Sequence, residues 1–192
     1  MRRSRGRYLG LRPADNPFAD YSFIYVALCT GDSYLGNTTH EYSPELTVQH
    51  KGFVNGTAAL NYLAEHYPDA AQVVVVGKTA GSVAAPLYGG LAADLLSDAQ
   101  VIVFGASSGA YPNDPDFNAD ILGLWGAYDT MPNWEVNEGL TARDWGPPRL
   151  WIQAGLHDPD IVMARFDYAF DQRARAEYDS DRFRRVEPHC LD

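Results

Sequence analysis

A threonine hydroxyl stands between two glycines, directly after a run of four valines. The valines occupy positions 73–76, and the segment Gly77-Lys78-Thr79-Ala80-Gly81 follows them. A strand, a sharp turn of the form G-x-S-x-G and a helix, in that order, present a nucleophile at the tip of the turn. The nucleophile holds a strained backbone conformation, so the residues two before and two after it must be small. Because Gly77 and Gly81 meet this need, the pattern predicts Thr79 as a nucleophile that attacks a carbonyl carbon.

The residue after the tip is predicted to stabilise the charge that such an attack creates. The backbone N–H of Ala80 would stand at the N-terminus of the following helix and point toward a developing oxyanion. Threonine adds a methyl group beside the reacting oxygen and stiffens the side chain, which would slow the reaction. Ser82 lies three residues further on, in the first turn of that helix. We interpret it as a packing or capping residue rather than as a substitute nucleophile.

An acid and a base are expected later in the chain, in that order. Asp158 follows an apolar run at 150–154, and His189 lies in the segment Glu187-Pro188-His189-Cys190 near the carboxyl end. His189 would take the proton from the hydroxyl, while Asp158 would fix the tautomer of the imidazole. The remaining histidines are weaker candidates, namely His40, His50, His66 and His157. No cluster has the spacing of metal ligands, so we expect neither a metal nor a cofactor.

Two other interpretations of the glycine turn stay open. The segment Gly77-Lys78-Thr79 is similar to the end of a phosphate loop, G-x-x-x-x-G-K-[ST]. That motif needs its first glycine at position 72, where Gln72 stands, and the valines that follow belong to a strand. Alternatively, the two glycines simply allow a tight connection between a strand and a helix.

The order of apolar runs predicts the elements that would position these side chains. Strands are expected at 23–28, 73–76, 101–104, 150–154 and 183–186, and helices at 51–66, 84–96, 118–125 and 161–177. A turn-rich stretch is expected at 33–44 and an irregular insertion at about 111–148. The alternation predicts an α/β fold with a mostly parallel sheet flanked by helices. Because residues 73–76 are continuously apolar, we expect them to be covered on both faces.

Length and charge limit the classes of partner. A chain of 192 residues with 46% hydrophobic content suits one domain, which we place at 16–192 behind a basic tail at 1–15. The formal net charge of −10 argues against nucleic acid and anionic membranes as partners. We expect no membrane span and, because no apolar stretch follows the basic tail, no signal peptide. Cys29 and Cys190 could form one disulfide.

Five blocks, in order, resemble the pectin acetylesterase/Notum family. The first is Cys29-Thr30-Gly31-Asp32 followed by Leu35-Gly36-Asn37, and the second is the stretch at 50–60 that begins His50-Lys51-Gly52. The glycine turn at 77–82, the segment Gly155-Leu156-His157-Asp158 and the closing Pro188-His189-Cys190 complete the set. The resemblance covers the chain from about residue 16 to its end.

This resemblance implies the carboxyl-side part of an α/β-hydrolase-like domain that lacks its first strands. The family's glycine-rich oxyanion segment, expected on an earlier strand, has no counterpart in the sequence. The family hydrolyses carboxylic esters and is commonly secreted, so an acetylated polysaccharide or a small ester is the implied substrate. Carried over by position, Thr79 takes the place of the serine nucleophile, Asp158 that of the acid and His189 that of the base.

The alternative is a non-catalytic protein that keeps the hydrolase scaffold, either as a saccharide-binding protein or as a degenerate hydrolase. Aromatic side chains stack on sugar rings, and the chain has four tryptophans, which are Trp125, Trp134, Trp145 and Trp151.

Overall fold

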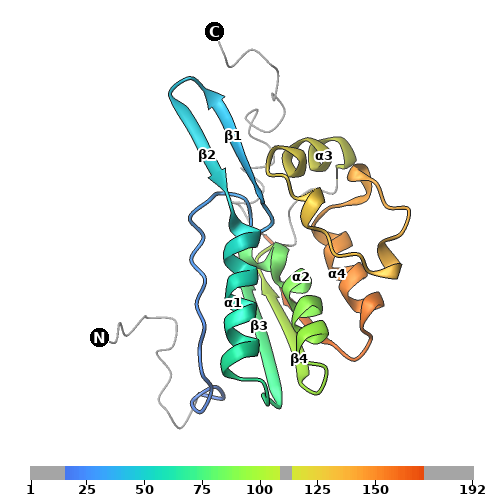
Figure 1. The fold of residues 1–192 in the computed structure, drawn as a ribbon. Coiled ribbons are helices and arrows are strands. Elements are labelled where there is room, and N and C mark those ends of the chain that lie inside the picture. Colours follow the sequence, from blue (N-terminus) through green and yellow to red (C-terminus); the bar gives the residue numbers. More distant parts are fainter. Residues whose placement is uncertain (1–15, 109–113, 171–192) are drawn as a thin grey trace.

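The computed structural model describes residues 16–108 and 114–170. Three strands form a sheet in the order β3 (Gln72–Lys78), β4 (Gln100–Ala106) and β5 (Val162–Phe166). Four helices accompany them: α1 (Gly52–His66), α2 (Ala80–Leu95), α3 (Pro115–Leu124) and α4 (Pro147–His157). A separate hairpin joins β1 (Thr38–Ser43) to β2 (Leu46–His50). Figure 1 shows the hairpin projecting beyond one end of α1. The fold is therefore α/β, with a parallel sheet and flanking helices.

The three strands of the sheet are parallel and in continuous register. Val74 pairs with Ile102 and Ile102 with Val162, while Ala106 stands opposite both Lys78 and Phe166. The carboxyl ends of all three strands consequently meet at one edge of the sheet. The residues that follow the strands emerge together at that edge, which we call the carboxyl edge.

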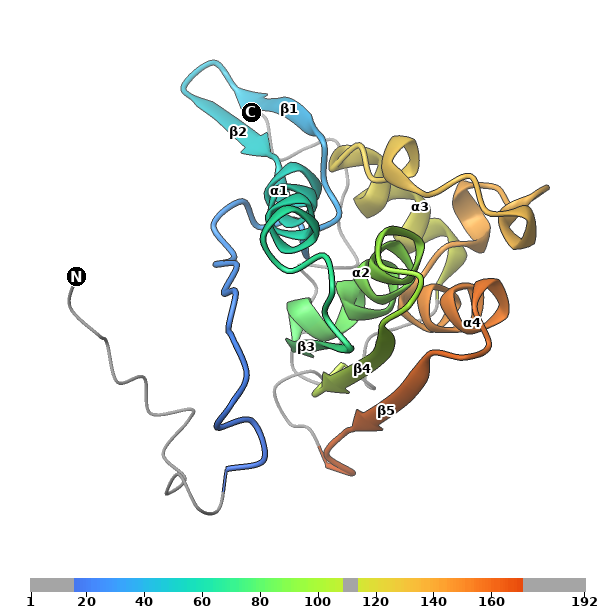
Figure 2. The same ribbon diagram turned by 60° about the horizontal axis from the view of Figure 1, so that its bottom comes forward.

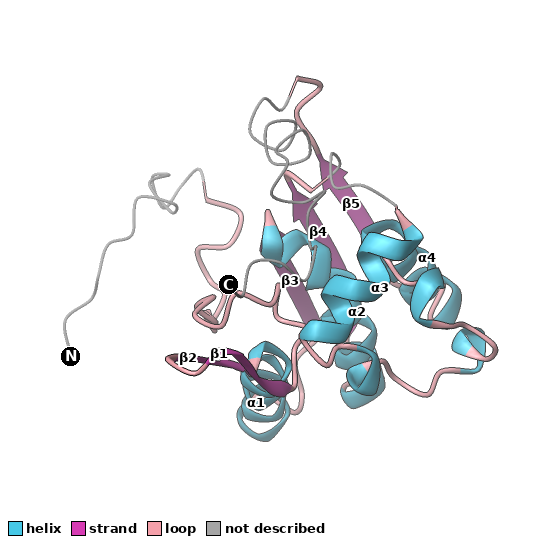
Figure 3. Cartoon of the chain, turned by 90° about the horizontal axis from the view of Figure 1, so that it is seen from above, coloured by secondary structure: helices cyan, strands magenta, loops and turns pink. Residues whose placement is uncertain are grey.

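The helices cover one face of this sheet. Figures 2 and 3 show α1, α2 and α4 on the same side of β3, β4 and β5. Val73, Val101 and Val103 face the helices and are buried. On the opposite face Val76 is 63% exposed and Phe104 is 37% exposed. The expectation that the valine strand is covered on both faces is therefore wrong for the described residues.

Several predicted elements agree with the structure. The helix expected at 51–66 is α1, and the strands expected at 73–76 and 101–104 lie within β3 and β4. The helix expected at 84–96 is α2, which begins four residues earlier. The helix expected at 118–125 corresponds to α3, whose N-terminus is capped by the Asp114 side chain.

The segment from 147 to 166 departs from the prediction. Residues 150–154, expected as a strand, belong to α4, and residues 162–166, expected as helix, form β5. Two prolines, Pro147 and Pro148, stand in the first turn of α4, where a missing N–H costs nothing. Leu150 and Ala154 are buried one turn apart, while Ile152 is 50% exposed. The apolar run therefore follows a helical period, not the period of a strand.

The amino-terminal part departs as well. Residues 23–28, expected as a buried strand, have no regular structure, and Tyr25 is 89% exposed. The turn-rich stretch expected at 33–44 contains β1, which pairs antiparallel with β2. The strand expected at 183–186, the carboxyl end of the helix expected at 161–177 and the tail at 1–15 lie outside the described residues. None of the helices in the described part is long and apolar enough to span a bilayer.

Candidate functional site

Thr79 joins β3 to α2 at the carboxyl edge of the sheet. Its backbone angles are φ 54° and ψ −114°, a conformation that a β-branched residue rarely adopts. Its N–H donates to the carbonyl oxygen of Ala106 at 2.8 Å, and its own carbonyl accepts from the N–H of Ser82 at 3.0 Å. These bonds hold the strained residue in place while its side chain stays exposed. Strain of this kind is concentrated at functional sites.

Gly77 and Gly81 meet beneath this turn. A Cβ atom at Gly77 would lie 2.0 Å from the carbonyl oxygen of Gly81, far closer than any non-bonded contact that a Cβ atom can make. A Cβ atom at Gly81 would meet nothing closer than the Tyr34 ring, at 3.7 Å. The backbone therefore needs glycine at position 77, whereas position 81 has room for a methyl group. The sequence pattern did not distinguish these two positions.

The turn directs a helix N-terminus toward the space beside Thr79. Ala80 is the first residue of α2, so its N–H has no partner within the helix. In the described part of the chain, no carbonyl or side chain accepts a hydrogen bond from it. An N–H at a helix N-terminus attracts negative charge. The oxyanion role of Ala80 stays a prediction, and the structure shows only that Ala80 is the first residue of α2.

A loop around Asp32 forms a wall beside the turn. Asp32 is fully buried, and its carboxylate accepts from the N–H of Gly52 at 2.7 Å and from the Thr30 hydroxyl at 2.8 Å. The Tyr34 ring lies next to Gly81. Tyr34 also accepts a 2.7 Å hydrogen bond on its carbonyl oxygen from the hydroxyl of Tyr88. The loop that contains the first block of the resemblance, at 29–37, therefore supports the turn. Its Asp32 is buried and is not open to a substrate.

Burial raises the pKa of the Tyr88 hydroxyl well above its ordinary value, and the nearby negative charge of Asp32 adds to the effect. Tyr88 therefore remains a neutral donor, and its hydrogen bond to the loop persists through the neutral range.

Ser82 lies on the inner side of the turn. It has no exposed surface, and its Oγ lies 2.7 Å from the Oγ of Ser108. A Cβ atom at Gly105 would lie 2.4 Å from the same Oγ. Ser82 therefore points into the interior between α2 and β4, and no substrate reaches it.

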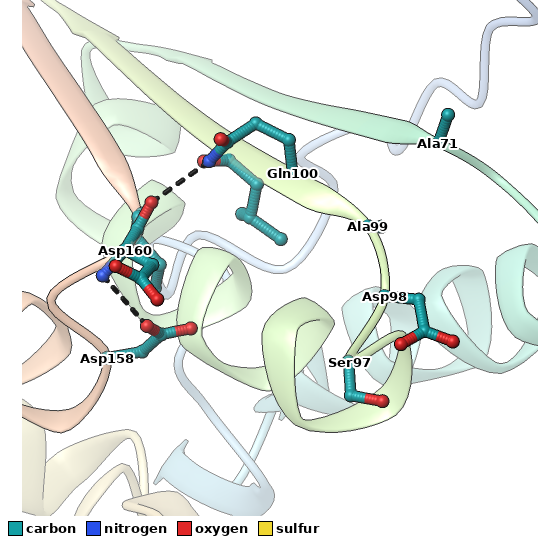
Figure 4. Close-up of a pocket in the computed structure, with 9 residues that line it drawn as sticks. Ala71, Ser97, Asp98, Ala99, Gln100, Asp158 and Asp160 are labelled. Atoms are coloured by element: carbon teal, nitrogen blue, oxygen red, sulfur yellow. Dashed lines mark hydrogen bonds between the residues drawn. The ribbon is translucent and has the colours of Figure 1, made fainter.

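Asp158 lies at the opposite edge of the sheet. Figure 4 shows it beside Asp160 and Gln100, in a pocket at the start of β4. Gln100 is the register partner of Gln72, the first residue of β3, while Thr79 follows the last. A strand of seven residues spans roughly 20 Å, so Asp158 does not reach Thr79. The prediction of Asp158 as the acid fails because 150–154 is not a strand.

A different carboxylate follows β5 at the carboxyl edge. The Oδ1 atom of Asp167 accepts a 2.8 Å hydrogen bond from the backbone N–H of Ser108, and its Oδ2 atom lies 3.0 Å from Arg165 Nη2. Ser107, between β4 and Ser108, donates its N–H to the carbonyl oxygen of Phe166. Asp167 thus shares an edge with Thr79. A sequence signal for it was present, because Asp167 directly follows the segment Val162-Met163-Ala164-Arg165-Phe166, which is apolar except for the arginine.

The described histidines have structural partners away from Thr79. The Nε2 atom of His157 lies 2.7 Å from Asp94 Oδ1, and its ring stacks on Trp134 with centroids 4.1 Å apart. The ring nitrogens of His50, which is buried, lie 3.0 Å from the Thr30 carbonyl oxygen and 2.8 Å from the Tyr42 hydroxyl. His189, the predicted base, lies outside the described residues.

The tryptophans mostly belong to the interior. Trp134, Trp145 and Trp151 are 8%, 6% and 9% exposed, respectively, and Trp125 packs partly buried against the core. Rings buried to this extent have no face open for a sugar. No observation on the described residues therefore favours the saccharide-binding alternative.

No family model matches the chain, and no curated protein or solved structure matches it either. Among residues 16–108 and 114–170, no group of three or more His, Cys, Asp or Glu side chains is arranged to hold a metal ion. The phosphate-loop interpretation has no support either, since positions 72–78 form β3.

Proposed function

We propose that the chain is a carboxylic ester hydrolase in which Thr79 is the nucleophile. The observation that carries this proposal is the backbone of Thr79, with φ 54° and ψ −114° at an exposed turn between a parallel strand and a helix. A turn under this strain is retained where it aims a side chain. The proposal keeps the resemblance to pectin acetylesterases as its guide to the reaction, with the fold taken as α/β-hydrolase-like.

The acid of the proposed site is Asp167. It replaces the Asp158 of the sequence prediction, because it lies at the same edge of the sheet as Thr79. The base of the proposal is His189, taken from the sequence alone. Asp167 would accept the N–H of the imidazole, fix its tautomer and stabilise the imidazolium.

The reaction then follows the general course of covalent catalysis. The Oγ1 atom of Thr79 bonds to the ester carbonyl carbon while its proton passes to the imidazole. The N–H of Ala80 donates to the oxyanion of the tetrahedral intermediate. The intermediate collapses as the C–O bond to the alcohol breaks, and the imidazole protonates the leaving alcohol. Water, deprotonated by the imidazole, then attacks the acyl–threonine ester and releases the carboxylic acid and the free hydroxyl.

The substrate class of the proposal is an acetylated polysaccharide or a small ester. A small acyl group suits a nucleophile that carries a methyl group beside its hydroxyl. The same methyl group predicts slow turnover, because misplacement of a reacting atom by even 1 Å costs about a hundredfold in rate.

Hydrolysis of p-nitrophenyl acetate by the full chain tests the proposal. We expect turnover above the buffer rate, loss of that turnover in Thr79→Ala and an increase of about tenfold or more in Thr79→Ser, which removes the methyl group. Thr47→Ala is the matched control, since Thr47 is exposed on β2, away from the site. Turnover that persists in Thr79→Ala, or that is missing from both the wild type and Thr79→Ser, contradicts the proposal.

A further inference from the structure

We propose that residues 21–28 form a strap that closes onto the outer edge of β3 as a fourth parallel strand. In the structure the strap has no regular structure, and no backbone–backbone hydrogen bond among the described residues involves positions 22–28. β3 is the first strand in the order of the sheet, so its side facing away from β4 has no strand partner in the described part of the chain. The strap and this edge therefore both present unpaired backbone groups.

Two side-chain hydrogen bonds hold the strap at opposite ends of β3. The hydroxyl of Tyr21 donates to Oε1 of Gln72, the first residue of β3. The carbonyl oxygen of Val26 accepts from the Tyr34 hydroxyl at 3.2 Å, and the Tyr34 ring lies next to Gly81, just beyond the last residue of β3. Figure 2 shows the segment (blue) on the side of β3 that faces away from β4. The strap therefore runs beside β3 and in the same direction.

The strap and the strand have matching lengths. An extended chain advances roughly 3.3 Å per residue, so positions 21–26 and 72–77 both span about 17 Å. The first residues of these two stretches are the pair joined by the side-chain hydrogen bond. In the register that this pair defines, Tyr25 falls opposite Val76, which is 63% exposed on the uncovered face of the sheet.

Apolar side chains of the strap are open to water. Phe23, Ile24, Tyr25 and Leu28 are 58%, 42%, 89% and 43% exposed, respectively. Side chains of a strand alternate between its two faces. Closure in this register turns Ile24 and Leu28 toward the helix-covered face, while the two aromatic rings extend the apolar surface of the other face. Removal of apolar surface from water favours this closure.

The connection from the strap to β3 has the form that parallel strands require. Such strands need a crossover of a dozen or more residues, usually with a helix, and residues 29–71 contain α1. α1 packs against α2 and lies on the same face of the sheet as α2 and α4. The strap, α1 and β3 therefore repeat the strand–helix–strand unit that α2 makes between β3 and β4, with the same hand.

Closure couples the edge of the sheet to the turn at Thr79. Residues 29–34 follow the strap directly and belong to the loop that forms a wall beside this turn. Tyr34 of that loop bonds to the strap and lies against the first turn of α2. A closed strap consequently fixes the position of the wall, and an open strap leaves it free to shift.

A disulfide between Tyr25→Cys and Val76→Cys tests the closure, in a full chain that also carries Cys29→Ser and Cys190→Ser. Paired residues of neighbouring strands lie about 5 Å apart, within the range that a disulfide spans. With glutathione disulfide as the oxidant, we expect an intramolecular bond to form at least about tenfold faster than between Tyr25→Cys and Ala164→Cys. Ala164 is the matched control because it is exposed in the same row of the sheet as Val76, two strands further away.

Amide hydrogen exchange of the unmodified chain gives a second measurement. Amides of an open strap exchange at the rate of a free peptide, whereas pairing with β3 should slow the exchange at 22–28 by about a hundredfold or more. The paired amides of β1 and β2 supply the reference for a protected strand in the same chain.

Either measurement can overturn the strap. Equal oxidation rates for the two cysteine pairs would do so, and so would exchange of 22–28 at the free-peptide rate. A disulfide that joins two copies of the chain would show that the edge of β3 receives a second copy instead. If a cysteine variant does not fold, exchange in the unmodified chain decides alone. Neither measurement involves turnover, so failure of the strap leaves the proposal for Thr79 intact, and the reverse also holds.

Discussion

Gly77 and Gly81 approach so closely that a Cβ atom at position 77 would lie 2.0 Å from the carbonyl oxygen of residue 81. The end of β3 and the first turn of α2 can lie this close only because residue 77 has no side chain. A Cβ atom at position 81 meets no such obstacle, since it makes only an ordinary 3.7 Å contact with Tyr34.

This asymmetry predicts different outcomes for two alanine substitutions. Gly77→Ala forces the strand and the helix apart and should lower the free energy of unfolding by about 3 kcal/mol or more. Gly81→Ala adds a methyl group within α2 and should change it by less than about 1 kcal/mol. Urea denaturation followed by circular dichroism measures both. Equal destabilisation by the two variants would refute the close approach.

The strain at Thr79 predicts a stability gain on its removal. Glycine adopts positive φ freely, so Thr79→Gly releases about 1–3 kcal/mol of strain and gives back roughly 0.5–1 kcal/mol as backbone entropy. We expect a net stabilisation of about 1 kcal/mol in thermal unfolding. Thr47→Gly, on exposed β2, is the control and should destabilise slightly. If both variants are less stable than the wild type by similar amounts, the strained turn is not present in solution.

The buried carboxylate of Asp32 should be essential for stability. It accepts hydrogen bonds from the Gly52 N–H, the Thr30 hydroxyl and the Tyr34 N–H. Asp32→Ala leaves these donors without a partner, and we expect a loss of about 3 kcal/mol or more in the free energy of unfolding. Asp20→Ala, at an exposed position, should change it by less than about 0.5 kcal/mol. A loss of stability in Asp32→Ala as small as that in Asp20→Ala would contradict the buried, hydrogen-bonded state of the Asp32 carboxylate.

The raised pKa of Tyr128 predicts part of the loss of stability at alkaline pH. Burial, followed by the negative charge of Asp120, raises the pKa of its hydroxyl from 10.0 to about 12. The hydroxyl donates toward the carbonyl oxygens of Asn118 and Ala119. The folded state holds this proton more tightly than the unfolded chain. The contribution of Tyr128 to stability is therefore fully present below pH 10 and is lost as the pH rises from 10 to about 12.

Tyr128→Phe should therefore make this decline shallower while costing about 1 kcal/mol at neutral pH through the lost hydrogen bonding. Unfolding midpoints in urea between pH 8 and pH 12 supply the measurement. A slope identical to that of the wild type would show that Tyr128 ionises equally in both states.

The part of the site that the sequence predicted is the part set by local residues. Four successive valines and the glycines around Thr79 predict a strand, a turn and a helix from the local sequence. The structure has β3, the strained turn and α2 at these positions. Ser82 lies in the first turn of α2, as the local sequence predicted, and it is buried there.

The candidate acid of the sequence prediction, Asp158, lies away from Thr79 because the period of one apolar run was misread. The run at 150–154 contains Trp and Ile and is typical of a strand, yet Pro147 and Pro148 begin a helix just before it. Reading it as a strand put the next carboxylate, Asp158, at the wrong edge of the sheet. The strand that follows α4 ends at Phe166, so the carboxylate at the carboxyl edge is Asp167. The proline pair was the available signal.

The exposed face of the sheet could not be predicted from composition. Val76 and Val103 are equally apolar, but Val103 is fully buried and Val76 is 63% exposed. Which face is covered depends on where the crossovers pass. Here α2 and α4 pack against each other and lie on one side of the sheet, a relationship between distant segments that no local pattern contains.

The most direct test of Thr79 as nucleophile is to trap its covalent adduct. A fluorophosphonate reacts with an activated hydroxyl, which forms an O–P bond as fluoride leaves. After incubation with the full chain and proteolysis, mass spectrometry should find the phosphonyl group on the peptide that contains Thr79, and Thr79→Ala should take up none. An adduct on another residue in both proteins, or no adduct on wild type and Thr79→Ser alike, would contradict the assignment.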